Sequence, residues 1–434
     1  MAETARPKPH PGVKQPERPP LLQVLGPGLI TGASDDDPSG IATYSQAGAQ
    51  FGLGLTWVML FSWPLMCAIQ EISARIGRVT GRGIAGNLKR HYPAPVVYSI
   101  VLLLLVANVI NLGADLGAMG AALKLLAGGP QLVYVALFGL VTVLLEVFSR
   151  YSRYVSILKW LTLSLLAYVG VVFVVKMSWL DVARSLVMPR ISLTAGYMTV
   201  VVAILGTTIS PYLFFWQAEE EVEEVKERDG AKPLERAPEQ APAELRRIRW
   251  DTWIGMGASN AVALFIILTT AATLHAHGVT DIQTSAEAAE ALRPIAGQFA
   301  FVVFSIGIIG TGFLAIPVLA SSAAYALGET FGWHVGLARK LSRAKAFYAT
   351  IAVATLVGVL LNDSPIDPIK ALFWSAVING VVAVPVMALM MHLSSHRAAM
   401  GDFKLHRGLK TVGWLATAVM AVAAVGLFAT WGKS

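Results

Sequence analysis

Long apolar stretches separated by short charged ones run through the whole chain. A helix needs around 20 apolar residues to cross a bilayer core about 30 Å thick, and the sequence contains eleven segments of this kind. The predicted membrane spans are residues 22–50, 54–76, 95–124, 131–148, 155–176, 195–219, 248–274, 298–327, 345–361, 370–393 and 411–431. This pattern predicts an all-α integral membrane protein.

The composition supports the same class. Of the 434 residues, 55% are hydrophobic and 14% are charged, whereas soluble domains carry about 25% charged residues. The single cysteine, Cys67, excludes an intrachain disulfide and a C-x-x-C zinc or redox motif. We expect contact with the lipid bilayer, and the sequence gives no reason to expect a nucleic-acid partner, a resident cofactor or an obligate protein partner.

The net charge of +7 reflects membrane topology. With a cytoplasmic N-terminus, the inside segments are the tail and the loops after the second, fourth, sixth, eighth and tenth spans. These segments hold about 27 of the 34 lysines and arginines, against about 7 outside. We therefore expect a cytoplasmic N-terminus, an extracytoplasmic C-terminus and, in the Pro-rich and basic residues 1–20, a flexible cytoplasmic tail.

Two of the predicted spans are interrupted in their middles. The first is broken by Asp-Asp-Asp-Pro-Ser-Gly at 35–40, and the sixth by Gly-Thr-Thr-Ile-Ser-Pro at 206–211. Pro38 and Pro211 lack an N–H, so each ends one half-helix and suits the first turn of the next.

Matching breaks in the first and sixth spans are typical of a transporter built from two inverted five-helix repeats. The predicted division places the first repeat at 21–176 and the second at 195–393. An eleventh span at 411–431 is appended to them.

The helix breaks also predict a cation site. Non-helical backbone at membrane depth is tolerated only beside protein or a wet cavity, and the carbonyl ends of half-helices attract cations. Asp37, Thr207 and Ser210 offer oxygen donors, which suit magnesium, calcium and manganese. We expect Asp37 to face the site, while Asp35 and Asp36 cap or solvate the break.

Further polar residues in the spans have two possible roles. Asp115 in the third span and Asn379 in the tenth lie among apolar residues, where a polar group either lines a pathway or bonds to a neighbouring helix. Asp36 and Tyr212 are candidates for the same pathway. The acidic run at 219–224 is expected to be solvated helix surface.

Several motifs resemble the Nramp family of divalent-metal transporters, over nearly the whole chain after residue 20. They are Gly26-Pro27-Gly28-Leu29, Asp37-Pro38, the stretch 46–52 and Thr80-Gly81. The resemblance implies a leucine-transporter-type fold, alternating access to one metal site in the middle of the membrane, and transition-metal uptake coupled to protons.

The chain departs from the family pattern at the positions where the resemblance places metal ligands and proton-relay groups. Gly40 stands where the family has a ligand asparagine, and Ser210 where it has a ligand methionine. Tyr212 and Gln217 replace two histidines, and the family's Asp-Leu-Ala-Glu retains only the aspartate, Asp115. Losing the thioether removes a preference for softer metals, and losing titratable groups removes a proton path.

These departures are similar to the Nramp-related magnesium transporters, and they are equally compatible with an aluminium-transporting branch. The leading expectation is therefore a transporter for hard divalent cations, Mg²⁺ first and also Mn²⁺, without proton coupling. The alternatives are a proton-coupled Mn²⁺ or Fe²⁺ symporter and an amino-acid or other organic-solute transporter of the same fold. An enzyme is not expected, because the sequence has no G-x-x-x-x-G-K-[ST] loop and no evident nucleophile-base pair.

Overall fold

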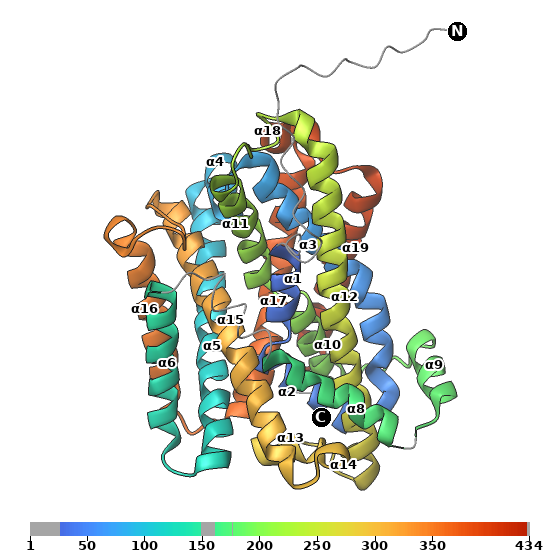
Figure 1. Ribbon diagram of the computed structural model, residues 1–434. Helices are drawn as coiled ribbons and strands as arrows, with labels where there is room; N and C mark the ends of the chain where they lie inside the picture. Colours follow the sequence, from blue (N-terminus) through green and yellow to red (C-terminus); the bar gives the residue numbers. More distant parts are fainter. Residues whose placement is uncertain (1–26, 149–160, 176, 432–434) are drawn as a thin grey trace, which may run out of the picture.

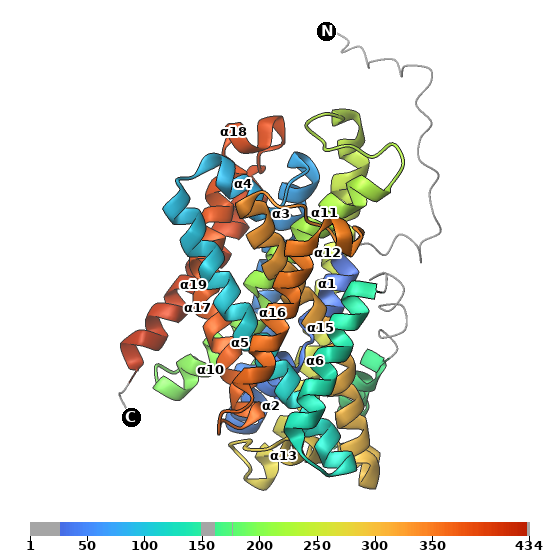
Figure 2. The ribbon, with the colours of Figure 1, turned by 90° about the vertical axis from the view of Figure 1, so that its left-hand side faces the viewer.

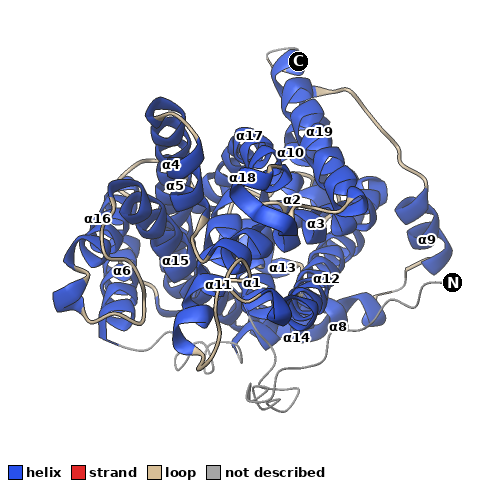
Figure 3. Cartoon of the chain, turned by 90° about the horizontal axis from the view of Figure 1, so that it is seen from above, coloured by secondary structure: helices blue, strands red, loops and turns tan. Residues whose placement is uncertain are grey.

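The computed structural model describes residues 27–148, 161–175 and 177–431, and all regular secondary structure in these ranges is helical (Figures 1 and 3). The predicted all-α architecture is therefore confirmed. The tail at 1–20, the first residues of the first span and positions 155–160 and 176 of the fifth lie outside the described residues. The longer helices are α1 (Pro27–Asp35), α2 (Pro38–Phe51), α3 (Thr56–Thr80), α4 (Ile84–His91), α5 (Ala94–Ala127), α6 (Gln131–Phe148), α8 (Leu166–Val174), α9 (Trp179–Val187), α10 (Ala195–Thr208), α11 (Pro211–Glu227), α12 (Ala241–Thr273), α15 (Ala300–Phe331), α16 (Lys345–Leu361), α17 (Pro368–Ser395) and α19 (Arg407–Thr430); α13 (Ser285–Glu290), α14 (Arg293–Ala296) and α18 (Arg397–Met400) are short.

Eight helical stretches in the described part are long and apolar enough to cross a membrane, or nine if α8 and α9 form one bent span. This count is lower than the eleven predicted spans for physical reasons. The stretch Pro38–Thr80 joins α2 and α3 and is counted once, α1 is a half-helix of nine residues, and Lys345–Leu361 is a shorter apolar helix. The division into repeats at 21–176 and 195–393 stays a prediction.

The broken helices lie in the centre of the bundle. Seen from above, α1, α2 and α11 lie between α5, α6 and α16 on one side and α12 and α19 on the other (Figure 3). α1 packs along α12, α10 along α17, and α5 along α15. A Cβ on Gly206 would lie 2.0 Å from the Ala376 carbonyl oxygen and 2.5 Å from the Gly380 nitrogen. Only glycine therefore allows α10 and α17 to approach this closely.

The outer helices present apolar side chains outward. Leu102 on α5 is 60% exposed, Leu140 on α6 is 58% exposed and Val422 on α19 is 71% exposed. Such large apolar residues fit a surface that faces lipid rather than water.

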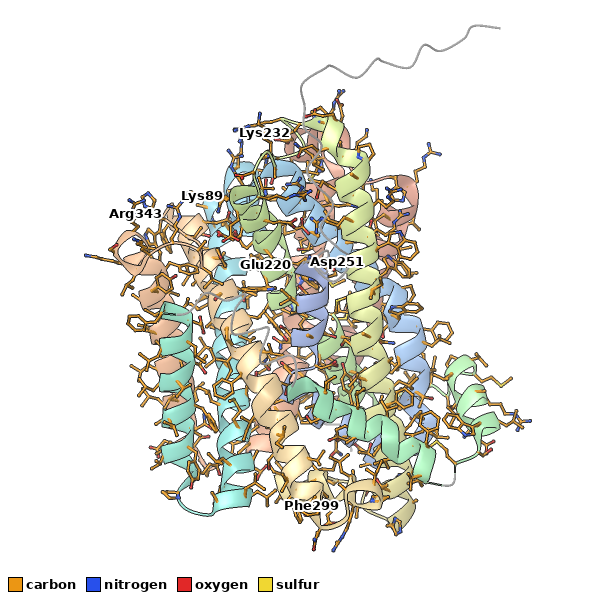
Figure 4. The ribbon with its side chains drawn as sticks, in the orientation of Figure 1. Lys89, Glu220, Lys232, Asp251, Phe299 and Arg343 are labelled. Atoms are coloured by element: carbon orange, nitrogen blue, oxygen red, sulfur yellow. The ribbon has the colours of Figure 1, made fainter. Side chains whose placement is uncertain are left out.

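Three basic residues mark one end of the molecule. Lys89, Lys232 and Arg343 lie at the end that carries α4 and α18, whereas Phe299 lies at the opposite end (Figure 4; Figure 2 shows the same ends from the side). We call the first of these the basic end. α11 continues to Glu227 and α12 begins at Ala241, so both helices extend beyond their predicted spans of 195–219 and 248–274.

An ion-pair network explains these extensions. Arg247 on α12 lies 2.5 Å from Glu221, 3.1 Å from Glu224 and 3.0 Å from Glu244. The expectation that the run 219–224 is solvated surface is wrong for Glu219 and Glu221, which are 2% and 0% exposed. For Glu221 the reason is that Arg247 neutralises its charge from the facing helix, which periodicity within one helix does not reveal.

Candidate metal site at two helix breaks

The first break lies where the sequence predicts it. α1 ends at Asp35 and α2 begins at Pro38, so Asp36 and Asp37 form the connection. Asp37 is the N-cap of α2 and accepts a hydrogen bond of 2.7 Å from the Gly40 N–H. The carboxyl thus satisfies a backbone donor that the helix itself leaves without a partner.

The second break is shorter than the predicted 206–211. α10 continues to Thr208 and α11 begins at Pro211. The Ser210 hydroxyl lies 2.7 Å from the Gly206 carbonyl oxygen and 2.8 Å from that of Thr207, and donates to them. Because the Ser210 hydroxyl forms hydrogen bonds with carbonyls at the end of α10, that helix extends into the predicted break. Three oxygens are thereby held together at the break.

Asp37 is the point where three helices meet. Its Oδ1 accepts from the Ser39 hydroxyl at 2.6 Å as well as from Gly40 N, and its Oδ2 accepts from Asn111 Nδ2 at 3.0 Å and from the Tyr212 hydroxyl at 3.3 Å. Asn111 belongs to α5 and Tyr212 to α11. Movement of any of these helices therefore changes the surroundings of the Asp37 carboxyl.

The partners of Asp37 are themselves fixed by neighbours. The Asn111 side-chain oxygen accepts from Ser375 of α17 at 2.6 Å, which orients the amide so that its NH₂ faces Asp37. Sequence reasoning missed both residues as part of the site. A polar residue inside an apolar span was the available signal, but spacing alone does not pair α5 with α17.

Tyr212 and Gln217, which stand where the family has histidines, connect α11 to α1. Tyr212 lies 3.3 Å from the Ser34 carbonyl oxygen in addition to its contact with Asp37. Gln217 accepts a hydrogen bond from the Thr31 hydroxyl. The predicted pathway residue Tyr212 is therefore placed at the site, and Gln217 lies further along the same helix pair.

Gly40 and Thr207 are brought together by the two breaks. A Cβ on Gly40 would lie 3.1 Å from the Thr207 hydroxyl, 3.2 Å from the Tyr44 ring and 3.4 Å from the Asp35 carbonyl oxygen. The space beside Gly40 is thus filled by Tyr44 and Thr207. A larger side chain at position 40 requires one of them to move.

Two further predicted residues are buried with free hydrogen-bonding capacity. Within the described residues, neither oxygen of the Asp115 carboxyl and neither polar atom of the Asn379 amide has a hydrogen bond of normal geometry. Asp115 lies within electrostatic range of Asp37 and Tyr212. Asn379 precedes Gly380, whose backbone approaches Gly206 at the second break. Asp115 is therefore a neighbour of the Asp37 carboxyl.

Asp35 and Asp36 are placed differently from the expectation that they solvate or cap the break. They are 0% and 7% exposed. Asp35 Oδ2 lies 2.6 Å and Asp36 Oδ1 3.0 Å from the Ser259 hydroxyl of α12. Tertiary packing of α12 against α1, which the sequence does not reveal, explains this difference.

The site is poor in charged ligands. In the ranges that the structure describes, no group of three or more His, Cys, Asp or Glu side chains is arranged to hold a metal ion. The neutral oxygens at the two breaks are instead the carbonyls of Ser34, Gly206 and Thr207 and the hydroxyls of Tyr212 and Ser210. Such a set suits a hard cation that keeps part of its water.

The relationship of the chain to known proteins agrees with this geometry. The family model described as "Natural resistance-associated macrophage protein-like", Nramp, matches residues 28–430. The chain belongs to the Nramp family. This membership confirms that it is a multi-pass membrane protein and not an enzyme.

Curated relatives and solved structures extend the comparison. The divalent metal cation transporter MntH of Klebsiella pneumoniae (strain 342) is 27% identical over 408 residues, covering 92% of each chain. A crystal structure of the Eremococcus coleocola manganese transporter has a TM-score of 0.74 at 17% identity, covering 96% of this chain and 89% of that one. MhsT in complex with L-phenylalanine has a TM-score of 0.64 at 13% identity, covering 95% of this chain and 100% of that one. These structural likenesses confirm the leucine-transporter-type fold.

Proposed function

We propose that this Nramp protein carries hard divalent cations across the membrane by alternating access, with Mg²⁺ as the preferred ion and Mn²⁺ as a second substrate. Relatives named as divalent metal cation and manganese transporters support the class of substrate. The observation that carries the preference is the set of oxygens: the Asp37 carboxylate at the first break, and at the second break the Ser210 hydroxyl with the carbonyls of Gly206 and Thr207, where no thioether is present.

In this proposal Asp37 is the charged ligand, and the second break supplies neutral oxygens. The Ser210 hydroxyl donates to the carbonyls of Gly206 and Thr207, and its oxygen lone pairs remain available to a cation. Gly40 contributes no side-chain ligand, so water would complete the coordination of the ion. Mg²⁺ usually keeps several waters beside one or two carboxylates.

We infer that transport is not coupled to protons. Tyr212 and Gln217 form hydrogen bonds with Asp37 and Thr31, and neither is a histidine, the side chain that exchanges a proton near neutral pH. A divalent cation gains about 2.3 kcal/mol per charge per 100 mV of inside-negative potential, so the membrane potential alone favours uptake.

A proton-coupled Mn²⁺ or Fe²⁺ symporter is the second candidate, because one observation favours it. Asp115 is fully buried, and its carboxyl lies near Asp37 without a hydrogen bond of normal geometry in the described part of the chain. Such a carboxyl can hold a proton that enters together with the metal ion.

Metal influx into proteoliposomes distinguishes the two candidates. Mg²⁺, Mn²⁺ and Ca²⁺ are offered outside under an inside-negative potential, with a pH dye in the lumen. Mg²⁺ entry without acidification is expected. Mn²⁺ entry with acidification and no Mg²⁺ flux would contradict the proposal and support the symporter.

We also propose that the basic end faces the cytoplasm, since Lys89, Lys232 and Arg343 lie there (Figure 4). The N-terminus is then cytoplasmic and the C-terminus extracytoplasmic. Lys232→Cys, in a Cys67→Ala background, should be labelled by a membrane-impermeant maleimide only after cells are permeabilised. Labelling of intact cells would reverse the orientation.

A further inference from the structure

The centre of the molecule contains more buried negative charge than one metal ion balances. Asp35, Asp36, Asp37 and Asp115 are each at most 7% exposed. Across the described ranges, none of these four carboxyls forms an ion pair with a lysine, arginine or histidine. Burying unpaired charges is strongly unfavourable. A single divalent cation at Asp37 would balance two of the four.

The buried basic side chains lie elsewhere. Arg75 and Arg78, the buried lysine or arginine residues of the described chain, pair with Glu71 at 2.5 Å and with Glu244 at 3.6 Å. Both are engaged toward the basic end by carboxylates of their own. The charge of the central carboxyls can therefore be removed in two ways, by protons on the carboxyls themselves or by a cation that the protein binds.

Asp35 and Asp36 meet at one hydroxyl group. Ser259 Oγ lies 2.6 Å from Asp35 Oδ2 and 3.0 Å from Asp36 Oδ1. A hydroxyl carries one proton and can donate it to only one of two carboxylates at a time. The second carboxylate then faces the oxygen lone pairs, which is unfavourable unless that carboxyl is protonated or a cation lies between the two.

A second, independent group points to the same place. The Tyr44 hydroxyl is fully buried; the Thr207 hydroxyl interacts with it, but without a hydrogen bond of normal geometry among the residues described. The charged groups that act on it most strongly are Asp35 and Asp36. Asp35 Oδ1 is also without a partner in that part of the chain. The Tyr44 hydroxyl thus lies within electrostatic range of both carboxyls, and Asp35 Oδ1 has capacity for a further ligand.

We propose that Asp35, Asp36, Ser259 and Tyr44 form a second site for a hard divalent cation, beside the Asp37 site on the side of the break that faces α12. All of its donors are oxygens, the type that Mg²⁺ and Mn²⁺ prefer. Two divalent ions would balance the four carboxyls. The second site rests on the proposed function in one respect, the choice of a hard divalent cation as the bound ion.

Counting bound Mn²⁺ on the purified full-length protein tests this proposal. The loss of the free Mn²⁺ signal in electron paramagnetic resonance gives the number of ions bound, and dipolar broadening reports two ions close together. Wild-type protein should bind two ions with broadening. Asp35→Asn combined with Asp36→Asn should bind one ion without broadening, and so should Asp37→Ala.

Asp251→Asn provides a matched control. Asp251 is a buried carboxylate of the same α1–α12 contact, and it accepts a 2.7 Å bond from the Gly28 N–H outside the proposed site. This variant should still bind two ions. Ser259→Ala keeps both carboxylates and should weaken the second ion roughly tenfold while leaving the first unchanged.

One ion in wild-type protein, or two ions in the Asp35→Asn/Asp36→Asn variant, would overturn the second site. If the double variant binds no ion, the Ser259→Ala variant decides the question. If it binds both ions as tightly as wild-type protein does, the proposal is overturned. If it binds one ion more weakly and the other unchanged, the proposal is supported. The count needs no flux, so two ions on a protein that fails to transport Mg²⁺ would contradict the proposed function alone.

Discussion

The basic end and the centre of this protein both bury several carboxylates, yet they balance the charge in opposite ways. At the basic end, Glu221, Glu224 and Glu244 surround Arg247, and Arg228 lies 3.0 Å from Glu244. In the centre, Asp37 accepts only from neutral donors.

This difference separates a permanent contact from a temporary one. A protein cation beside each carboxylate gives a network that holds α11 against α12 whether or not metal is present. In the proposed function, carboxylates without such a partner are balanced by the transported cation. The proposed metal site therefore lies where, in the described part of the chain, no basic side chain pairs with the carboxylates. The following predictions test this difference between the basic end and the centre.

Asp37→Ala has the largest expected effect. It removes the charged ligand and the group on which α2, α5 and α11 converge, so metal uptake into proteoliposomes should fall to the level of empty vesicles. Asp251→Asn, a buried carboxylate outside the site, should retain uptake. Normal uptake by Asp37→Ala would refute the site assignment.

Arg247→Met should reduce stability and leave metal selectivity unchanged. It leaves the buried Glu221 without its partner, which should lower the free energy of unfolding by about 3 to 5 kcal/mol, measured by thermal unfolding in detergent. Arg397→Met is the control, because the Arg397–Asp402 pair is largely exposed and should contribute less than about 1 kcal/mol. If an Arg247→Met protein that remains folded changed its preference between Mg²⁺ and Mn²⁺, the separation between the structural network and the metal site would be wrong.

Ser210→Met with Gly40→Asn should shift selectivity severalfold toward Mn²⁺ and Cd²⁺, because a thioether is a softer ligand. Asparagine at position 40 must displace Tyr44 or Thr207, which lie 3.2 and 3.1 Å from its Cβ position. Ser210→Met alone should therefore show the shift with less loss of total flux. Competition of Cd²⁺ against Mg²⁺ uptake measures it, and unchanged competition would contradict the ligand role of Ser210.

Tyr212→Phe should have the smallest effect. It removes one hydroxyl contact with Asp37, worth about 1 kcal/mol, so the half-saturating Mg²⁺ concentration should change roughly fivefold. Tyr197→Phe is the matched control, since its hydroxyl donates to the Arg190 carbonyl away from the site. Equal effects of the two variants would argue against contact between Tyr212 and the metal site.

Much of the fold could be predicted from apolar segment lengths and from Pro38 and Pro211, because helix formation and helix breaking are local properties. The position of Asp37 in the first helix break could also be predicted, because Pro38 follows it. Partners from other helices could not be predicted in this way. The bonds from Asn111 and Tyr212 to Asp37, and from Ser259 to Asp35 and Asp36, depend on which helices pack together.

The same limit explains the acidic run at the basic end. A series of glutamates at a helix end indicates a solvated surface when the helix is considered alone. Glu221 is buried only because α12 brings Arg247 to it. Local sequence patterns thus indicated where charge is concentrated, while tertiary contacts determine what balances it.

The charge moved per metal ion tests the central claim most directly, that transported metal and not protons balances the central carboxylates. Current and Mg²⁺ uptake are measured together in proteoliposomes at several pH gradients. The account predicts two charges per Mg²⁺ at every pH gradient, and a reversal potential that shifts by about 30 mV per tenfold change in Mg²⁺, the Nernst slope of a two-charge process. More than two charges per ion, with a reversal potential that follows the pH gradient, would contradict it.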